Sequence, residues 1–213
     1  MKNVLITGMS LGLGKSLAQK YKESGYEVYG LSRRKVEGYN HIECDLKWKH
    51  QIPAKLWNLL KDVSEIDVVI LNAGVLGQIE FLNKVIISEL ERVLDINTLS
   101  NKMILDYLIN KKIKVKQVVA ISSGASISTY PGWGTYSISK AALNMMMKVY
   151  AIENPKIHFL SLSPGPVNTS MQDFICEEID GEKFEWKKKF VKLRENNEIK
   201  LLKLGNLEEL VAI

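Results

Sequence analysis

Cysteine and histidine are scarce in this chain of 213 residues. It has two cysteines, Cys44 and Cys176, and three histidines, with no Cys-x-x-Cys pair and no clustering of the two residue types. A disulfide framework or a zinc site needs several such residues at short spacings. We therefore predict neither disulfides nor a bound metal.

Long apolar runs are also missing. The first run, residues 4–6, stops at Thr7-Gly8, far short of the roughly 20 residues that cross a bilayer, and it does not resemble a signal peptide. No repeat, low-complexity tract or linker divides the chain. We expect one globular domain over residues 1–213, located in the cytoplasm, without a membrane partner.

Positive charge is in mild excess. The formal net charge is +5, and the basic residues are scattered apart from residues 187–189 and the pair Arg33-Arg34. The lysine triplet is either a solvated helical face, which is the favoured interpretation, or an anion-facing patch. An excess of this size affects solubility and steering and does not define function, so we predict no nucleic-acid partner.

Short apolar runs alternate with longer segments of helical period. The expected strands are residues 4–7, 28–31, 41–44, 68–72, 118–122 and 157–161, and the expected helices are residues 15–24, 54–63, 89–110 and 137–153. The runs are continuously apolar, as in sheets covered by helices on both faces. This order predicts an α/β fold with a doubly wound parallel sheet, which is Rossmann-like.

Three local signals set helix ends. Gly25 is positioned as a left-handed C-cap of the first helix. Ser88 and Glu91 have the spacing of a capping box at the start of the third helix. Pro155 prevents the fourth helix from continuing.

A glycine-rich turn follows the first strand, with Gly8, Gly12 and Gly14 in the spacing G-x-x-x-G-x-G. Without a Cβ the backbone can approach a pyrophosphate, and the next helix presents free N–H groups to the anion. The alternative is that these glycines only permit a tight turn. The residues of this turn predicted to bind a dinucleotide are Gly8, Ser10, Leu11, Gly12, Leu13 and Gly14.

The second strand ends in Ser32-Arg33-Arg34 without a carboxylate. An acidic residue at this place would bind a ribose 2′-hydroxyl, whereas guanidinium groups suit a 2′-phosphate. We predict NADP(H) as the cofactor, with NAD(H) less favoured. The alternative is that both arginines are merely exposed loop residues.

Tyr136 and Lys140 stand four residues apart at the opening of a predicted helix. They therefore share a face, and an ammonium there is expected to lower the pKa of the phenol toward neutrality and to reach the nicotinamide ribose. Ser122-Ser123 end an apolar strand at the sheet edge where ligands bind in such folds.

In these motifs the sequence resembles the short-chain dehydrogenase/reductase family, in its compact single-domain branch, over nearly the whole chain. The matching residues are those of the turn at residues 7–14, then Asp45, Leu46, Asn72, Ala73, Gly74, Asn97, Ser123, Tyr136, Lys140, Pro164, Gly165, Val167 and Thr169. The resemblance implies that Asp45-Leu46 lie near the adenine, that residues 72–74 support the central sheet, and that residues 164–169 line the nicotinamide.

The resemblance also implies hydride transfer between a nicotinamide and a carbonyl or alcohol. In that reaction Tyr136 protonates the substrate oxygen, Ser123 positions it, Lys140 tunes Tyr136, and Asn97 holds a water of a proton relay. Two alternatives stay open: a non-catalytic NADP-binding module or redox sensor, and a nucleotide-sugar epimerase or dehydratase. The short chain argues against the second alternative.

The C-terminal part departs from the family pattern. Residues 204–209 resemble the segment before a last helix and a seventh strand, but the chain stops at Ile213, so we expect that strand to be absent. A homodimer through the helices around Asn97 and Leu143 stays open, and a tetramer is not expected. Residues 170–203 are expected to form a substrate lid. The apolar residues that either line a pocket for a hydrophobic carbonyl or pack the lid onto the core are Tyr130, Trp133, Met171, Phe174, Phe184 and Trp186.

Overall fold

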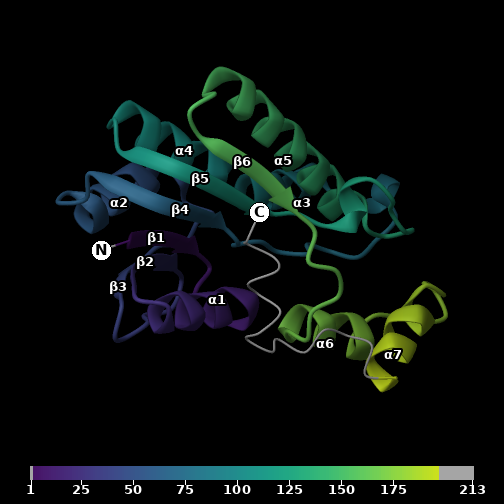
Figure 1. The fold of residues 1–213 in the computed structure, drawn as a ribbon. Coiled ribbons are helices and arrows are strands. Elements are labelled where there is room, and N and C mark those ends of the chain that lie inside the picture. Colours follow the sequence, from purple (N-terminus) through teal and green to yellow (C-terminus); the bar gives the residue numbers. More distant parts are fainter. Residues whose placement is uncertain (1, 197–213) are drawn as a thin grey trace.

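A computed structural model of the chain describes residues 2–196, and its centre is a parallel sheet of six strands in the order β3-β2-β1-β4-β5-β6 (Figure 1). The strands are β1 (Lys2–Thr7), β2 (Tyr26–Ser32), β3 (Asn40–Glu43), β4 (Glu65–Leu71), β5 (Lys114–Ile121) and β6 (His158–Leu162). Every neighbouring pair is parallel. The predicted doubly wound α/β fold is confirmed. The expectation about a seventh strand concerns residues 204–213, which lie outside the described residues.

Helices cover both faces of this sheet. The α-helices are α1 (Gly12–Glu23), α2 (Ile52–Leu60), α3 (Ile87–Leu94), α4 (Ser100–Asn110), α5 (Gly134–Glu153), α6 (Ser170–Glu177) and α7 (Lys187–Glu195). Four shorter helical segments are η1 (Lys49–Gln51), η2 (Leu82–Lys84), η3 (Asp95–Leu99), which is a π-helix, and η4 (Gly124–Ser126). No helix among residues 2–196 has the length and apolar character that a bilayer crossing needs. The cytoplasmic location stays a prediction.

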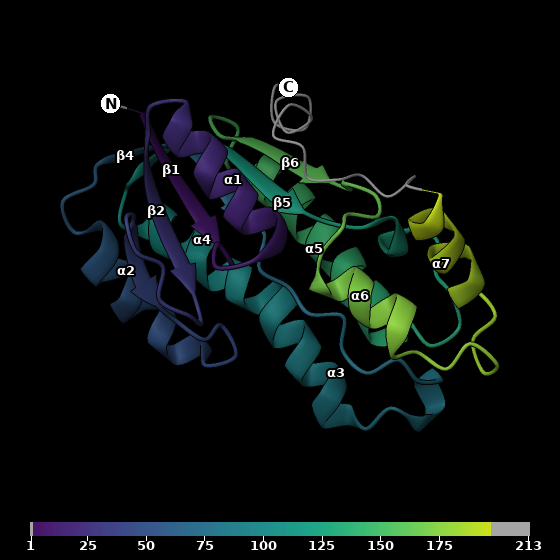
Figure 2. The same cartoon turned by 90° about the horizontal axis from the view of Figure 1, so that it is seen from below.

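Two apolar clusters lie on opposite faces of the sheet, because alternate strand residues point to opposite sides. On one face, Leu5 and Leu31 pack with side chains of α2, α4 and α5. On the other face, Val4 and Ile6 pack with Leu17 and neighbouring residues of α1. Figures 1 and 2 show these layers, with α6 and α7 next to each other on the side of the sheet that carries α1.

The helix ends partly match the prediction. Gly25 has a φ of +80° and donates its N–H to the carbonyl of Lys22 at 3.0 Å, which confirms the left-handed C-cap. The helix α5 ends at Glu153, two residues before Pro155, as predicted. The capping box is wrong. Because α3 begins at Ile87, Ser88 lies inside the first turn, and no side chain caps the helix at Ile86.

The long predicted helix over residues 89–110 is interrupted. The π-helical segment Asp95–Leu99 lies between α3 and α4, so the helical register changes there. Segments of this kind occur mostly as single turns inside α-helices, often at functional sites. Here the segment carries Asn97, one of the predicted site residues.

Candidate active site

The carboxyl ends of β1 and β4 meet at the point where the strand order reverses. Thr7 ends β1, and its Oγ1 accepts hydrogen bonds from the backbone N–H groups of Asn72 and Ala73, both at 3.0 Å. The Asn72 side chain donates in return to the carbonyl of Thr7 at 2.9 Å. Ligands bind in the crevice at such a switch point in open α/β sheets. These bonds hold its two rims together.

The glycine-rich turn lies at this crevice, and its backbone conformation leaves no room for side chains at the glycine positions. Gly8 and Gly12 have φ angles of +71° and +54°, in the left-handed region that favours glycine. A Cβ on Gly14 would lie 2.3 Å from the carbonyl oxygen of Gly8 and 2.5 Å from Asn72 Nδ2. At Gly12 a Cβ would meet the Thr169 side chain at 3.1 Å, so the loop after β6 lies against the turn.

A cavity of about 610 Å³ extends from this turn to the lid. The predicted site residues that line it are Gly8, Ser10, Leu11, Gly12, Leu13, Ser32, Arg33, Asp45, Leu46, Asn72, Ala73, Gly74, Ser123, Tyr136, Lys140, Pro164, Gly165, Val167 and Thr169. Three predicted residues do not line it. Gly14 lies behind the turn against Gly8, Arg34 is exposed on the surface, and Asn97 is fully buried next to the cavity wall.

The two arginines after β2, Arg33 and Arg34, differ in their relation to the cavity. Both guanidinium groups are exposed, and neither forms an ion pair within residues 2–196. Only Arg33 lines the cavity. The Ser32 hydroxyl donates to the carbonyl of Arg34 at 2.9 Å, which fixes the turn after β2.

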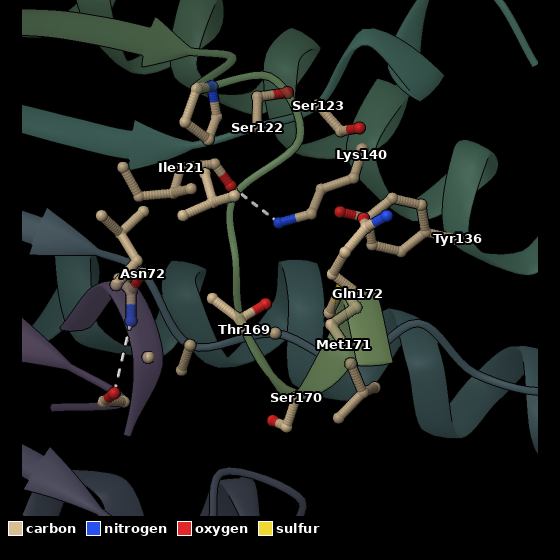
Figure 3. A pocket seen from close by; sticks show the side chains of 18 of the residues that line it. Asn72, Ile121, Ser122, Ser123, Tyr136, Lys140, Thr169, Ser170, Met171 and Gln172 are labelled. Carbon is tan, nitrogen blue, oxygen red and sulfur yellow. Dashed lines mark hydrogen bonds between the residues drawn. The ribbon is translucent and has the colours of Figure 1, made fainter. Parts of the chain in front are cut away.

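Tyr136 is buried at the start of α5, and Figure 3 shows its phenol at one wall of the cavity near Ser123. Burial raises the pKa of the phenol above its usual value, and a hydrogen bond with the Ser123 side chain lowers it in part. The expected lowering of the pKa of Tyr136 by Lys140 is therefore wrong for this structure. The phenolate would lose its hydration in the buried site, and this cost dominates.

Lys140 is enclosed by protein. Its Nζ donates to the carbonyl of Ile121 at 2.7 Å and lies 5.7 Å from the centroid of the Tyr136 ring. Burial lowers the pKa of Lys140 to about 8, since the ammonium has lost its water without gaining a carboxylate. Figure 3 shows the lysine reaching across the cavity wall between β5 and Tyr136.

Asn97 braces the neighbouring elements. Its amide accepts from the N–H of Val75 at 2.8 Å and donates to the carbonyl of Val75 and to Ser139 Oγ, each at 2.9 Å. The backbone carbonyl of Asn97 accepts a hydrogen bond from Asn101 Nδ2 at 2.8 Å. These contacts join the loop after β4 to α5. A Cβ on Gly74 would lie 3.3 Å from Asn97 Oδ1 and 3.4 Å from Lys140 Nζ, so the three residues pack together.

The apolar residues predicted for the lid and for the loop before α5 have two different roles. Tyr130, Trp133 and Met171 line the cavity. The Trp186 indole donates to the carbonyl of Pro131 at 2.8 Å and fixes the lid to the loop before α5. The two phenylalanines differ. Phe184 is buried against Gly132, whereas Phe174 is exposed. Residues 197–203 of the expected lid lie outside the described part.

Several lining residues were not predicted. Among them are Cys44, Gln172, Ile175, Lys189, Phe190 and Leu193. One signal was present for Gln172. It shares a helical face with Ile175 and Cys176 at spacings of three and four, and a polar residue on an apolar face calls for an explanation.

The comparisons with known proteins agree with this geometry. The sequence model described as short chain dehydrogenase matches residues 2–180. The benzil reductase ((S)-benzoin forming) of Bacillus subtilis is 31% identical, with 82% of this chain and 78% of that protein covered. The sepiapterin reductase of Bos taurus is 30% identical, over 81% and 75%.

Solved structures show the same likeness. A short chain dehydrogenase/reductase from Saccharomyces cerevisiae superimposes with a TM-score of 0.85 at 28% identity, over 95% of this chain and 86% of that one. The KRED1-Pglu enzyme gives a TM-score of 0.84 at 26% identity, over 96% and 91%. The chain therefore belongs to the short chain dehydrogenase family of oxidoreductases, which act on alcohol and carbonyl groups.

Proposed function

We propose that this chain is an NADP(H)-dependent reductase that interconverts a carbonyl and an alcohol, with Tyr136 as its acid and base. The observation that carries the proposal is the convergence of Ser123, Tyr136 and Lys140 on the cavity that the glycine-rich turn opens into. We also propose that residues 1–213 form one oxidoreductase domain, with residues 170–203 as its substrate lid.

The cavity fits a nicotinamide dinucleotide. A cradle without Cβ atoms at Gly8 and Gly12 leaves space for a pyrophosphate at the start of α1. The part of the cavity wall formed by Asp45 and Leu46 suits an adenine ring, and residues 164–169 would lie along the nicotinamide. When bound, the dinucleotide supplies or accepts the hydride.

The residues of this chain supply the proton chemistry. The Tyr136 hydroxyl gives its proton to the substrate oxygen during reduction, and Ser123 donates a hydrogen bond to the same oxygen. The raised pKa of Tyr136 keeps the phenol protonated before reaction, which suits the direction of carbonyl reduction. Lys140, with its lowered pKa, returns a proton to the phenolate.

The preference for NADP(H) is supported by Arg33. Its guanidinium lines the cavity at the end of β2 and is free of carboxylate partners within residues 2–196, so it is available to a 2′-phosphate. Arg34 does not line the cavity and is assigned no direct role.

The substrate end of the cavity favours an aromatic carbonyl compound. Tyr130, Trp133 and Phe190 form one group of packed rings there, with Trp133 and Phe190 stacked at a centroid distance of 5.6 Å. Aromatic walls bind flat apolar ligands through large contact areas. The names of the relatives, benzil reductase and sepiapterin reductase, are consistent with ring-bearing carbonyl substrates.

We further propose a homodimer through the outer face of α5. Asn97 and Leu143 are themselves fully buried, so they lie inside the subunit. The opposite side of α5 bears a continuous apolar stripe at helical spacing. The exposed members of this stripe are Ile138, Met145, Val149 and Ile152. An exposed stripe of this length is typical of a contact between subunits. Met145→Asp should convert a dimer into a monomer in light scattering, whereas Ile127→Asp, at an exposed isoleucine outside α5, should not.

A carbonyl panel tests the enzymatic proposal. Purified protein is mixed with NADPH or NADH and with aryl ketones, aryl aldehydes and diketones, and the nicotinamide absorbance is followed. We expect turnover of aromatic carbonyls with NADPH and slower turnover with NADH. Binding of NADPH without oxidation by any carbonyl would favour a non-catalytic module. Dinucleotide retained through purification, without net turnover, would favour an epimerase or dehydratase.

A further inference from the structure

Gln172 is a buried amide in the wall of the cavity. It lies in the first turn of α6, has 4% of its surface exposed and lines the cavity with Met171 and Ile175. Figure 3 shows its side chain extending from α6 in the direction of Tyr136. Met171 and Ile175 belong to the same apolar cluster as Tyr136, so α6 packs against the proposed catalytic residue.

The protein leaves most of this amide unpaired. Within residues 2–196, the side chain of Gln172 makes one hydrogen bond, from Nε2 to the sulfur of Cys176 at 3.3 Å. A carboxamide offers two donor hydrogens and two acceptor sites, and a thiol sulfur is a weak acceptor. One N–H and the carbonyl oxygen are therefore available to a molecule in the cavity.

This arrangement discriminates between ligands. A ketone with two apolar arms would displace water from the amide and give it no partner in return. A substrate with a second oxygen on the carbon next to the reacting carbonyl would offer an acceptor to the free N–H. Sites built to form a hydrogen bond reject analogues that lack the group much more strongly than apolar pockets do.

We propose that Gln172 determines substrate specificity and that the substrate class is a vicinal dicarbonyl, reduced to a 2-hydroxy ketone. This inference rests on the proposed reductase function. One carbonyl carbon takes a hydride as NADPH is oxidised to NADP⁺, and its oxygen takes a proton from Tyr136. The second carbonyl stays unreduced, and its oxygen accepts the free N–H of Gln172.

Two ketones that share one skeleton test the assignment. The first is 1-phenylpropane-1,2-dione, and the second is 1-phenylpropan-1-one, which lacks the second oxygen. In Gln172→Leu we expect kcat/KM for the dione to fall at least about tenfold, as for one lost hydrogen bond in a buried site. The value for the monoketone should stay the same or rise. Comparing the dione-to-monoketone ratio between the wild type and the variant cancels the greater intrinsic reactivity of the dione.

Cys176→Ala is the matched control, since it removes the one partner that the amide has within residues 2–196 and keeps Gln172 itself. If Gln172 serves only to hold α6 in place, both variants will lower both activities and the melting temperature alike, and the proposal is overturned. An unchanged dione-to-monoketone ratio in Gln172→Leu overturns it as well, while turnover of the monoketone leaves the proposed function standing.

A binding measurement separates failure of the role assigned to Gln172 from failure of the proposed reductase function. In the presence of NADP⁺ the dione can bind but cannot be reduced, so its effect on the melting temperature needs no turnover. We expect the dione to raise the melting temperature of the wild type and of Cys176→Ala, and to have little effect on Gln172→Leu. A shift equal in all three proteins contradicts the role of Gln172, whether or not the panel shows activity.

Discussion

The side-chain nitrogen of Lys140 donates a hydrogen bond to the main-chain carbonyl of Ile121 at 2.7 Å. This bond holds the ammonium against the end of β5 and 5.7 Å from the centroid of the Tyr136 ring. The phenol of Tyr136 interacts with the Ser123 side chain instead, and burial keeps the pKa of the phenol high. The three residues are thus placed around one cavity.

Tyr136→Phe should abolish turnover and leave cofactor binding nearly intact. The substitution removes one oxygen from a buried ring that packs against Trp133, so the shape of the wall is kept. General acid catalysis typically contributes a factor of about 100 to 10,000 in rate, and we expect a loss in kcat of at least that order. Rates are measured from NADPH absorbance and affinity from NADPH fluorescence. A variant with near-normal kcat would show that another group carries the proton.

Arg33→Ala should weaken NADPH binding about tenfold and leave NADH binding unchanged, because a charge-assisted bond to phosphate is lost. Arg34→Ala is the natural control, since Arg34 is equally exposed but does not line the cavity. Dissociation constants for both cofactors are measured by fluorescence titration on the two variants. Equal effects of the two substitutions would place the 2′-phosphate elsewhere, and tighter binding of NADH than NADPH by the wild type would refute the cofactor preference.

Gly14→Ala should destabilise the fold and weaken dinucleotide binding together. Its Cβ would lie 2.3 Å from the carbonyl oxygen of Gly8, a backbone atom that cannot swing away. Overpacking of this kind costs about 1–3 kcal/mol. Gly181→Ala is the control, because its Cβ would meet only the Lys187 side chain, at 3.4 Å. Urea unfolding and NADPH titration on both variants measure the effects, and an unaffected Gly14→Ala would mean that the turn relaxes more easily than its contacts indicate.

The parts that were predictable from sequence are those fixed by local spacing. The turn with Gly8 and Gly12 follows from glycine spacing after an apolar strand, and both residues adopt left-handed angles. Tyr136 and Lys140 share a helix face because they stand four residues apart, and they meet the same cavity. The alternation of strands and helices was sufficient for the sheet, since continuous apolar strands require cover on both faces.

The remaining features depend on contacts between distant segments. The capping motif at Ser88 is intact in sequence, yet α3 starts at Ile87, two residues before the start that the motif predicts, so the motif has no helix end to cap. Lys140 pairs with a carbonyl of β5, and no side-chain pattern records which carbonyl is near. Nor does sequence show that Arg33 faces the cavity and Arg34 does not, because adjacent loop residues differ only in the path of the backbone.

Replacing the buried lysine should stabilise the protein while it inactivates it. Lys140 has a folded-state pKa of about 8 against an ordinary 10.5, because burial disfavours the ammonium. Below pH 8 both the folded and the unfolded chain hold the proton, and the folded state bears the full cost of burying the charge, roughly 3 kcal/mol. Between pH 8 and 10.5 the unfolded chain binds more protons, so the stability of the wild type rises with pH.

Lys140→Met fills similar space without a charge, at the loss of one hydrogen bond to Ile121 worth about 1 kcal/mol. In the absence of cofactor, its free energy of unfolding at pH 7 should exceed that of the wild type by roughly 2 kcal/mol, and the difference should shrink toward pH 10. Urea unfolding at the two pH values measures this, with Lys148→Met, at an exposed position of the same helix, as the control. A Met variant that is less stable at pH 7 would mean that the fold stabilises the ammonium. A stability difference independent of pH would mean that burial does not shift the pKa of Lys140, because only a destabilised charge produces a gain that fades as the lysine loses its proton.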